Sequence, residues 1–280
     1  MGASWGEPRT LFGSRTKPTE IASGAGPIYA RAMKSRPFPP ALPHGELVEV
    51  FPDIFFVTGT IGLPGPLPVR FSRNMVVLRE GERLVLVNSV RLTNEGLAKL
   101  EALGKVTDVL RLAGFHGADD AFYKDRYGAK VWAIRGQTYT AGFNTKAEPY
   151  FEPDAAVDAD TKLPIEGASL YVFSTRPSEA VLRLARHGGI LIPGDCLQNW
   201  GAPDEHFSLV GKIMMRFMGF LKAHNVGPGW VKAAKPKAAE LRGLLDLDFE
   251  HLLPAHGTPV KGGAKEAYRP AIERAASLAR

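Results

Sequence analysis

Three hydrophobic strands of this sequence each run directly into a short loop that carries glycine together with histidine or aspartate. The three segments are residues 109–120, 190–196 and 252–257. In open sheets of alternating strands and helices, ligands bind where the strands end, so these loops are expected to meet at one site. Together they offer two imidazoles and up to three carboxylates. That set suits a divalent metal such as zinc, iron or manganese.

Each segment also has a simpler explanation when it is taken alone. A single Asp or His at the end of a strand commonly forms a turn or caps a helix. Three such ends in this order are much harder to explain by turn formation, so we interpret them as one site. The candidate metal ligands are His116, Asp119, Asp120, Asp195 and His256.

The pattern of apolar residues along the chain predicts an α/β protein. Short strands in meander order come first, and strands alternating with helices follow, which predicts two mixed sheets with helices on the outside. Five segments are expected to be helical: residues 93–103, 179–186, 207–223, 236–245 and 264–279.

The basic charge of the chain is concentrated at its start. The net charge is +6 over 280 residues, and residues 1–44 hold six basic and two acidic side chains, which is +4 of it. This segment has seven prolines and no apolar periodicity. We therefore expect a Pro-rich basic arm over residues 1–44, flexible or wrapped on a domain formed by residues 45–280. Basic and aromatic residues are not interleaved along a stripe, so no nucleic-acid surface is expected.

The single cysteine excludes a disulfide framework, so the fold does not depend on an oxidising compartment. No apolar run approaches the roughly 20 residues of a membrane span, and the start of the chain lacks the apolar core of a signal peptide. A cytoplasmic location is expected, and association with a membrane is not.

The expected helix over residues 207–223 is apolar around most of its circumference. Its polar residues form one narrow strip: Ser208, Lys212, Arg216, Gly219 and Lys222. A helix packed on two sides is the preferred explanation, and a lid over an apolar substrate is the second. A homodimer face and an interfacial helix with a basic strip are the other options.

The order and spacing of these motifs resemble the metallo-β-lactamase superfamily of hydrolases, from about residue 46 to the end of the chain. Residues 106–120 resemble the strand that delivers the family's His-x-His-x-Asp-His motif. Gly194-Asp195 resembles the strand-end Asp that bridges two metals, and residues 255–257 resemble the segment with the last histidine. The resemblance implies a four-layer αββα sandwich, in agreement with the pattern above. The wording of the motifs is closest to a degenerate, uncharacterised branch of the superfamily.

The departures from the family pattern leave the metal site incomplete. In one alignment His116 takes the place of the first motif histidine, and Ala118 stands where the second would be. In the other alignment His116 takes the place of the second motif histidine, and an insertion must follow it. The histidine of the third motif is missing, and Arg176 stands near its place. One of the two metal sites has therefore lost most of its ligands under either alignment.

Two functions remain open. In the first, one oxygen-rich site, better suited to iron or manganese than to zinc, activates a water that attacks an ester, thioester, lactone or amide, with Asp120 as the base. In the second, no metal binds, and the protein is a non-catalytic binding or scaffolding module in which Arg176 pairs with Asp195 or Asp120. A small molecule is the expected partner. The residues expected to line its pocket are Arg176, Cys196 and His206.

Overall fold

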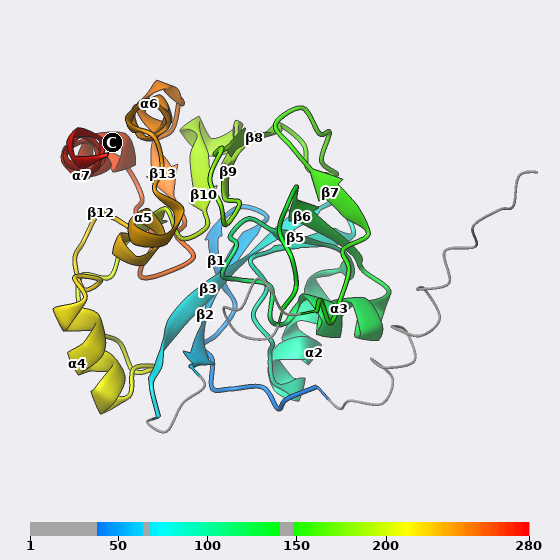
Figure 1. Ribbon diagram of the computed structural model, residues 1–280. Helices are drawn as coiled ribbons and strands as arrows, with labels where there is room; N and C mark the ends of the chain where they lie inside the picture. Colours follow the sequence, from blue (N-terminus) through cyan, green and yellow to red (C-terminus); the bar gives the residue numbers. More distant parts are fainter. Residues whose placement is uncertain (1–37, 64–67, 141–147, 280) are drawn as a thin grey trace, which may run out of the picture. The chain divides into compact units, whose positions relative to one another are not determined.

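The computed structural model describes residues 38–63, 68–140 and 148–279. Two mixed β-sheets face each other, and helices cover the outer face of each (Figure 1). The predicted αββα sandwich is confirmed. Of the predicted arm, residues 1–37 lie outside the described residues. The segment that follows packs on the domain, where the ring of Phe38 lies 5.6 Å from that of Phe122.

The first sheet has seven strands in sequential order, antiparallel from β1 to β4 and parallel from β4 to β7. The change falls at β4, where the chain first crosses over through a helix, as a parallel pair requires. The strands are β1 (Val48–Phe51), β2 (Ile54–Gly62), β3 (Arg70–Glu80), β4 (Arg83–Val87), β5 (Lys105–Arg111), β6 (Lys130–Ile134) and β7 (Ala155–Val157).

The second sheet has four strands in the order β13 (His251–Leu252), β10 (Ile190–Pro193), β9 (Ala180–Leu184) and β8 (Ala168–Val172). β10 pairs parallel with β13, and the other pairs are antiparallel. A separate antiparallel pair is formed by β11 (Leu197–Gln198) and β12 (Asn225–Val226). The core between the two main sheets is apolar and includes Ile54, Val76, Val87, Leu182 and Ile192.

The prediction of a helix over residues 179–186 is wrong, because this segment is the strand β9. β9 pairs with both β8 and β10, so it lies in the interior of its sheet. Four of its five residues are buried. A strand buried on both faces shows no alternation, so its short apolar run cannot be told from a helix by periodicity.

Helices α2 (Asn94–Leu103) and α3 (Asp120–Tyr127) cover the first sheet (Figure 1). Thr93 caps α2 as predicted, and its hydroxyl accepts a hydrogen bond from the Gly96 N–H at 3.3 Å. The second sheet is covered by α5 (Pro228–Ala234), α6 (Ala238–Gly243) and α7 (Ala264–Leu278). Short 3-10 turns lie at Arg186–Gly188 and Leu244–Asp246. Within the described ranges, no helix combines the length and apolar character needed to cross a bilayer.

The helix expected over residues 207–223 is shorter than predicted. α4 spans Leu209–Phe217 and begins at Ser208, which caps it. The expectation that the helix packs on two sides is wrong, since only one side is covered. Three apolar residues at helical spacing are largely exposed, at 74%, 52% and 87%: Leu209, Ile213 and Phe217.

Candidate metal site

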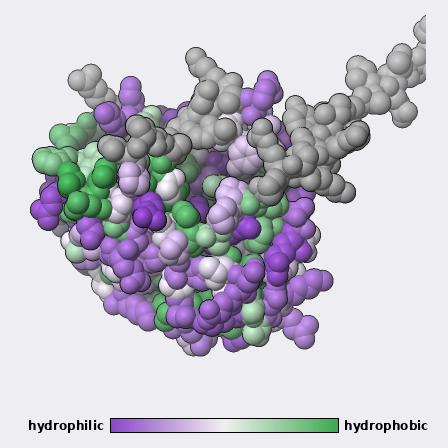
Figure 2. All heavy atoms as spheres, turned by 90° about the horizontal axis from the view of Figure 1, so that it is seen from below, coloured by the Kyte–Doolittle hydropathy of each residue, from purple (hydrophilic) through white to green (hydrophobic). Residues whose placement is uncertain are grey.

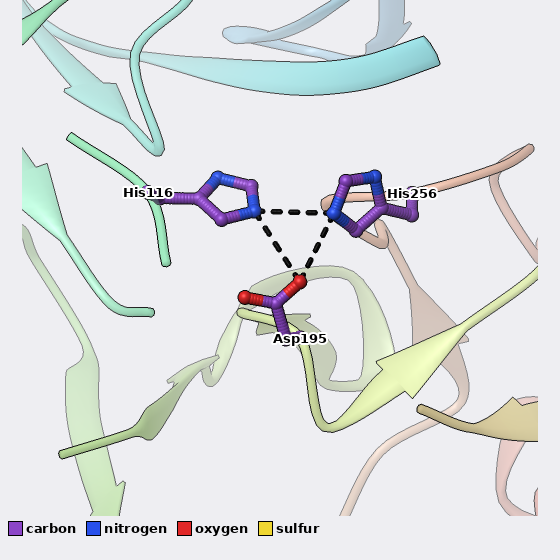
Figure 3. A group of neighbouring side chains, drawn as sticks. All are labelled: His116, Asp195 and His256. Carbon is purple, nitrogen blue, oxygen red and sulfur yellow. Dashed lines mark hydrogen bonds and ion pairs between the residues drawn. The ribbon is translucent and has the colours of Figure 1, made fainter. Parts of the chain in front are cut away.

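Three of the predicted ligands converge on one point, although they come from distant parts of the chain (Figure 3). The Nε2 atoms of His116 and His256 lie 3.2 Å apart. Asp195 Oδ1 lies 3.0 Å from Nε2 of His256 and 3.5 Å from Nε2 of His116. All three side chains are at least 90% buried. Two imidazole nitrogens and one carboxylate oxygen therefore face one another in a small triangle.

Each of the three residues lies in a loop after a strand of the sandwich. His116 follows β5, Asp195 follows β10 and His256 follows β13, so the ends of both sheets contribute. Gly194 allows the two sheet ends to approach closely, because a Cβ there would lie 2.6 Å from both Ala113 Cβ and Glu179 Oε1. The expectation that the loops after these strands meet at one site therefore agrees with where the three residues lie.

Hydrogen bonds fix the position and the protonation of His256. Its Nδ1 lies 3.0 Å from the carbonyl oxygen of Ser72, which can only accept, so Nδ1 carries the proton. In the neutral form of the ring, the lone pair is then on Nε2, the atom that faces the triangle. A carbonyl partner on the far nitrogen is the usual arrangement for a metal-ligating histidine. The ring also packs against Trp200, at 4.6 Å between ring centroids.

Two buried asparagines hold the loops that carry the ligands. Asn74, on β3, donates from Nδ2 to the carbonyls of Pro254 and Gly257, at 2.9 and 2.6 Å, on either side of His256. Asn88, after β4, donates to the Pro193 carbonyl at 3.1 Å, next to the loop of Asp195. Its Oδ1 accepts from the N–H of residue 112, at the end of β5. These amides bind all three loops to the first sheet.

Two residues of the triangle have shifted pKa values, and two of its buried polar atoms lack a described hydrogen-bond partner. Burial lowers the pKa of the His116 imidazole, although the Asp195 carboxylate acts in the opposite direction. Burial acts to raise the pKa of Asp195, but His116 and His256 outweigh it and lower that pKa. Among the described residues, neither His116 Nδ1 nor Asp195 Oδ2 has a hydrogen-bond partner, and both are buried. Such buried unpaired atoms are costly unless something else satisfies them.

The donor set fits one divalent metal ion. Ligand atoms around a tetrahedral zinc are about 3.3 Å apart, given bonds of about 2.0–2.1 Å, and the three distances here are 3.0, 3.2 and 3.5 Å. Two histidines with one carboxylate leave a fourth position open, as in catalytic zinc sites, and the same three donors also serve non-haem iron. The expectation of an oxygen-rich site is thereby corrected, since nitrogen supplies two of the three donors.

Asp119 lies beside this group but is bound to other partners. Its Oδ2 forms an ion pair with the guanidinium of Arg73, on β3, and accepts a hydrogen bond from the Arg91 N–H at 2.8 Å. Arg73 is only 6% exposed, and its charge is close enough to contribute to the lowered pKa of His116. The structure therefore pairs Asp119 with arginine rather than placing it among the converging ligands.

Asp120 is also held away from the triangle, at the start of α3. It is completely buried, and its two oxygens accept hydrogen bonds from Ser89 at 2.6 Å and from Tyr139 at 2.5 Å. Burial raises the pKa of Asp120 against the effect of these two donors. The expectation that Asp120 is a ligand and the base is corrected, because its oxygens are occupied and it does not line the cavity described below.

Arg176 does not pair with the site carboxylates, which corrects the pairing expected for a metal-free protein. Its Nη1 donates to the Ser178 hydroxyl at 3.0 Å and to the Thr175 carbonyl at 3.3 Å. Asp195 instead faces the two histidines. Arg176 lines a second cavity, of about 660 Å³, which also borders His116.

Cys196 and His206, the other expected pocket residues, are structural. Cys196 is completely buried in the core behind the second sheet, and burial together with nearby carboxylates raises the pKa of its thiol well above the ordinary value. His206 is 9% exposed, and its Nδ1 lies 2.9 Å from the Thr60 hydroxyl. Neither residue lines the cavities beside His116, which corrects the pocket expectation for both.

Two charged residues near the site were not predicted. Arg73 stands in a buried stretch of β3, where a charged residue is a signal of a partner that the sequence analysis did not use. Glu179 is completely buried, and its Oε1 accepts from the Cys196 N–H at 2.8 Å. Burial, and then the charge of Asp195, raise the pKa of Glu179 well above its ordinary value. Its segment was assigned to a helix, so no signal pointed to this contact.

The triangle opens into a cavity of about 300 Å³ whose walls are mostly apolar. α4 and the residue after it supply three methionines to the wall: Met214, Met215 and Met218. Aromatic side chains supply much of the rest: Phe71, Phe115, Trp200, Phe220 and Trp230. The polar side chains in the lining are Arg73, Gln198 and the three converging residues. Among the described residues of this lining, Asp195 is the only carboxylate.

Comparison with known proteins supports the fold and gives no match by sequence. No protein-family model matches the chain, and no curated protein matches it. Solved structures of metallo-β-lactamases do match. VMB-1 is 14% identical with a TM-score of 0.56, and the match covers 82% of this chain and 97% of VMB-1.

Two further structures agree. FIM-1 from Pseudomonas aeruginosa, in its mono-zinc form, is 13% identical with a TM-score of 0.54, over 86% of this chain and 99% of FIM-1. The metallo-β-lactamase from Pontibacter korlensis is 16% identical with a TM-score of 0.54, over 81% and 98% of the two chains. The chain therefore has the metallo-β-lactamase fold.

Proposed function

We propose that this protein is a hydrolase that holds one divalent metal ion with His116, Asp195 and His256. The convergence of these three buried side chains, with a fourth direction left open, is the observation that carries the proposal. Zinc suits the two imidazoles and one carboxylate best, with ferrous iron next and manganese third. The substrate is an ester, thioester, lactone or amide.

The bound metal would lower the pKa of a water ligand and so supply a hydroxide nucleophile near neutral pH. The chain's own residues would do the rest. The methionines and aromatic rings of the cavity would hold an uncharged, apolar part of the substrate and exclude water. Arg73, which lines the same cavity, carries a fixed positive charge suited to the developing oxyanion.

The comparisons support a single metal. The FIM-1 structure is of a mono-zinc form, so this fold is known with one zinc ion. In the present chain the guanidinium of Arg73 supplies positive charge to Asp119, which a second ion would otherwise have to provide. We therefore propose a degenerate branch of the superfamily, with one metal position retained and the other replaced by arginine.

A non-catalytic, metal-free binding module of the same fold is the second candidate. It is favoured by the distances in the triangle, since all three lie within or close to hydrogen-bonding range, and protons alone can link the atoms. A cytoplasmic location is proposed in either case, in keeping with one buried thiol and no disulfide.

Metal analysis of untagged protein tests the proposal. We expect about one equivalent of metal in the wild type and its loss in Asp195→Ala and His256→Ala. His206→Ala is the matched control, because this histidine is equally buried but hydrogen-bonded to Thr60, and it should keep the metal. Metal added to stripped protein should raise its melting temperature, since an ion bound only by the native state stabilises it.

The opposite result would favour the binding module. Less than about a tenth of an equivalent, with no thermal shift on adding zinc, iron or manganese, would refute the hydrolase proposal. Equal metal content in the wild type and both variants would place the ion elsewhere in the protein.

A further inference from the structure

α4 is apolar on two sides, and only one of them is packed. Met214 and Met215 line the cavity and are largely covered. Leu209, Ile213 and Phe217 are four residues apart and project to the surface, where they are 74%, 52% and 87% exposed. Surface helices of globular proteins normally place polar side chains there. Together with Met218, which is 53% exposed, these three residues form an apolar patch on this helix.

The charged side chains of α4 and of the turn after it are all cationic. Lys212, Arg216 and Lys222 are exposed, and none of them forms an ion pair with another described residue. Asp204 and Glu205 precede this segment and Glu240 follows it, while residues 206–239 between them contain six lysines and arginines and no aspartate or glutamate. Figure 2 looks at this side of the molecule and shows a hydrophobic patch at the left, over the region of α4, with hydrophilic side chains beside it.

We propose that α4 and the residues that follow it dock on an anionic lipid surface. Exposed leucine, isoleucine and phenylalanine with flanking lysine and arginine are the composition of helices that lie in a membrane interface. The apolar side chains enter the acyl boundary while the cations bind the lipid headgroups. The protein is then attached at the surface through α4, without a membrane-spanning helix.

The charges favour a bilayer over a second copy of the chain. A two-fold dimer brings the same patch of each subunit together, so Lys212 and Arg216 would face their own copies with no acidic side chain from this stretch to compensate. An anionic bilayer supplies the missing negative charge. Met218 belongs both to the patch and to the cavity lining, so the surface that meets the lipid is continuous with the cavity.

Sedimentation with vesicles tests this inference without any need for activity. The full chain should sediment with phosphatidylcholine vesicles that contain about one third phosphatidylglycerol, and far less with phosphatidylcholine alone. About 0.5 M salt should weaken the binding. Leu209→Ser and Phe217→Ser should each reduce the partition coefficient about tenfold, because each removes a large apolar group from the lipid.

Matched variants separate the patch from other sources of binding. Leu209→Ser and Phe217→Ser leave the net charge unchanged, so a loss cannot come from the basic start of the chain. Leu278→Ser and Val48→Ser, which alter exposed apolar residues of α7 and β1, should bind like the wild type. Lys212→Glu with Arg216→Glu should abolish the preference for anionic lipid.

Three results would overturn the inference. The first is wild-type protein that stays in the supernatant at low salt. The second is vesicle binding that survives Leu209→Ser and Phe217→Ser together, which would assign it to another basic segment. The third is a stable dimer by light scattering that Phe217→Ser converts to a monomer, which would show that a second copy covers the patch.

Discussion

The carboxylates of Asp119 and Asp195 are both largely buried, but different partners compensate their negative charges. Asp119 meets the guanidinium of Arg73, a cation that belongs to the chain. Asp195 meets only the imidazoles of His116 and His256, and its second oxygen is buried without a partner among the described residues. A buried carboxylate needs a permanent cation or several donors to remain charged at low cost.

This difference indicates which of the two aspartates would still need a bound cation to compensate its charge. The charge of Asp119 is neutralised by Arg73, so adding an ion there would bring it against a guanidinium. The group around Asp195 is incomplete, and its acceptor atoms point at one another (Figure 3). A single metal at Asp195 and none at Asp119 is the pattern that this asymmetry predicts.

Replacing Arg73, the cation that pairs with Asp119, is expected to have the largest effect on stability. Arg73→Met should lower the free energy of unfolding by about 3 kcal/mol, because it leaves the mostly buried Asp119 carboxylate without a cation and with only the Arg91 N–H as a described partner. For a chain of this size the melting temperature should fall by about 10 °C, as measured by calorimetry or circular dichroism.

Two variants serve as controls for that result. Arg73→Lys keeps the positive charge and should lose much less stability. Arg73→Met combined with Asp119→Asn should recover most of the loss, since the unpaired charge is gone. A single Arg73→Met variant within about 1 kcal/mol of the wild type would contradict the role given to this ion pair.

The scaffold that presents the incomplete group can be loosened without touching a ligand. Asn74→Ala should cost about 1–3 kcal/mol in unfolding free energy, because the carbonyls of Pro254 and Gly257 lose their buried donor. Metal affinity, measured by competition with a chelator, should fall about 10–100-fold as the His256 loop relaxes. Asn225→Ala, which removes an exposed bond to the Gly219 carbonyl, should change neither quantity appreciably. Unchanged metal affinity in Asn74→Ala would show that the loop holds its shape without this side chain.

Asp120 extends the comparison to a carboxylate held by neutral donors, and the expected effect is the smallest. Its pKa is raised in the folded state, so the folded protein holds a proton that the unfolded chain releases as the pH rises. This carboxyl therefore costs the native state stability as the pH rises above its ordinary pKa. Urea unfolding between about pH 4 and pH 8 should show a smaller decline for Asp120→Asn than for the wild type. Parallel pH profiles for the two proteins would contradict the shift.

The sequence predicted the sandwich and the convergence of three candidate residues for a physical reason. Strands that end in glycine-containing loops place their next side chains at one edge of a sheet, and that rule located His116, Asp195 and His256. The rule could not distinguish Asp119 and Asp120 from the three residues that converge, because the direction of a side chain within a loop depends on its tertiary partners. Ser89, Tyr139 and Arg73, which bind those two carboxylates, lie elsewhere in the sequence.

The other discrepancies have causes of the same kind. β9 was taken for a helix because a central strand carries no alternation. α4 was expected to be packed on two sides because burial was inferred from hydrophobicity alone. The structure shows that Leu209 and Phe217 are apolar without being buried. The hydrophobicity of a residue indicates that burial would be favourable, but the fold determines whether the residue is buried.

The asparagine bonds and the ligand triangle also affect when the site can form during folding. His116 and His256 are 140 positions apart in the sequence, and Asp195 is 61 positions from His256. Asn74 reaches 183 positions along the chain to hold the last loop. A fragment that stops before the last strand lacks His256, so an ion that needs all three residues could be held only after the final strand has joined its sheet. Bound metal would therefore act as a signal that the whole sandwich, from its first hairpin to its last loop, has closed.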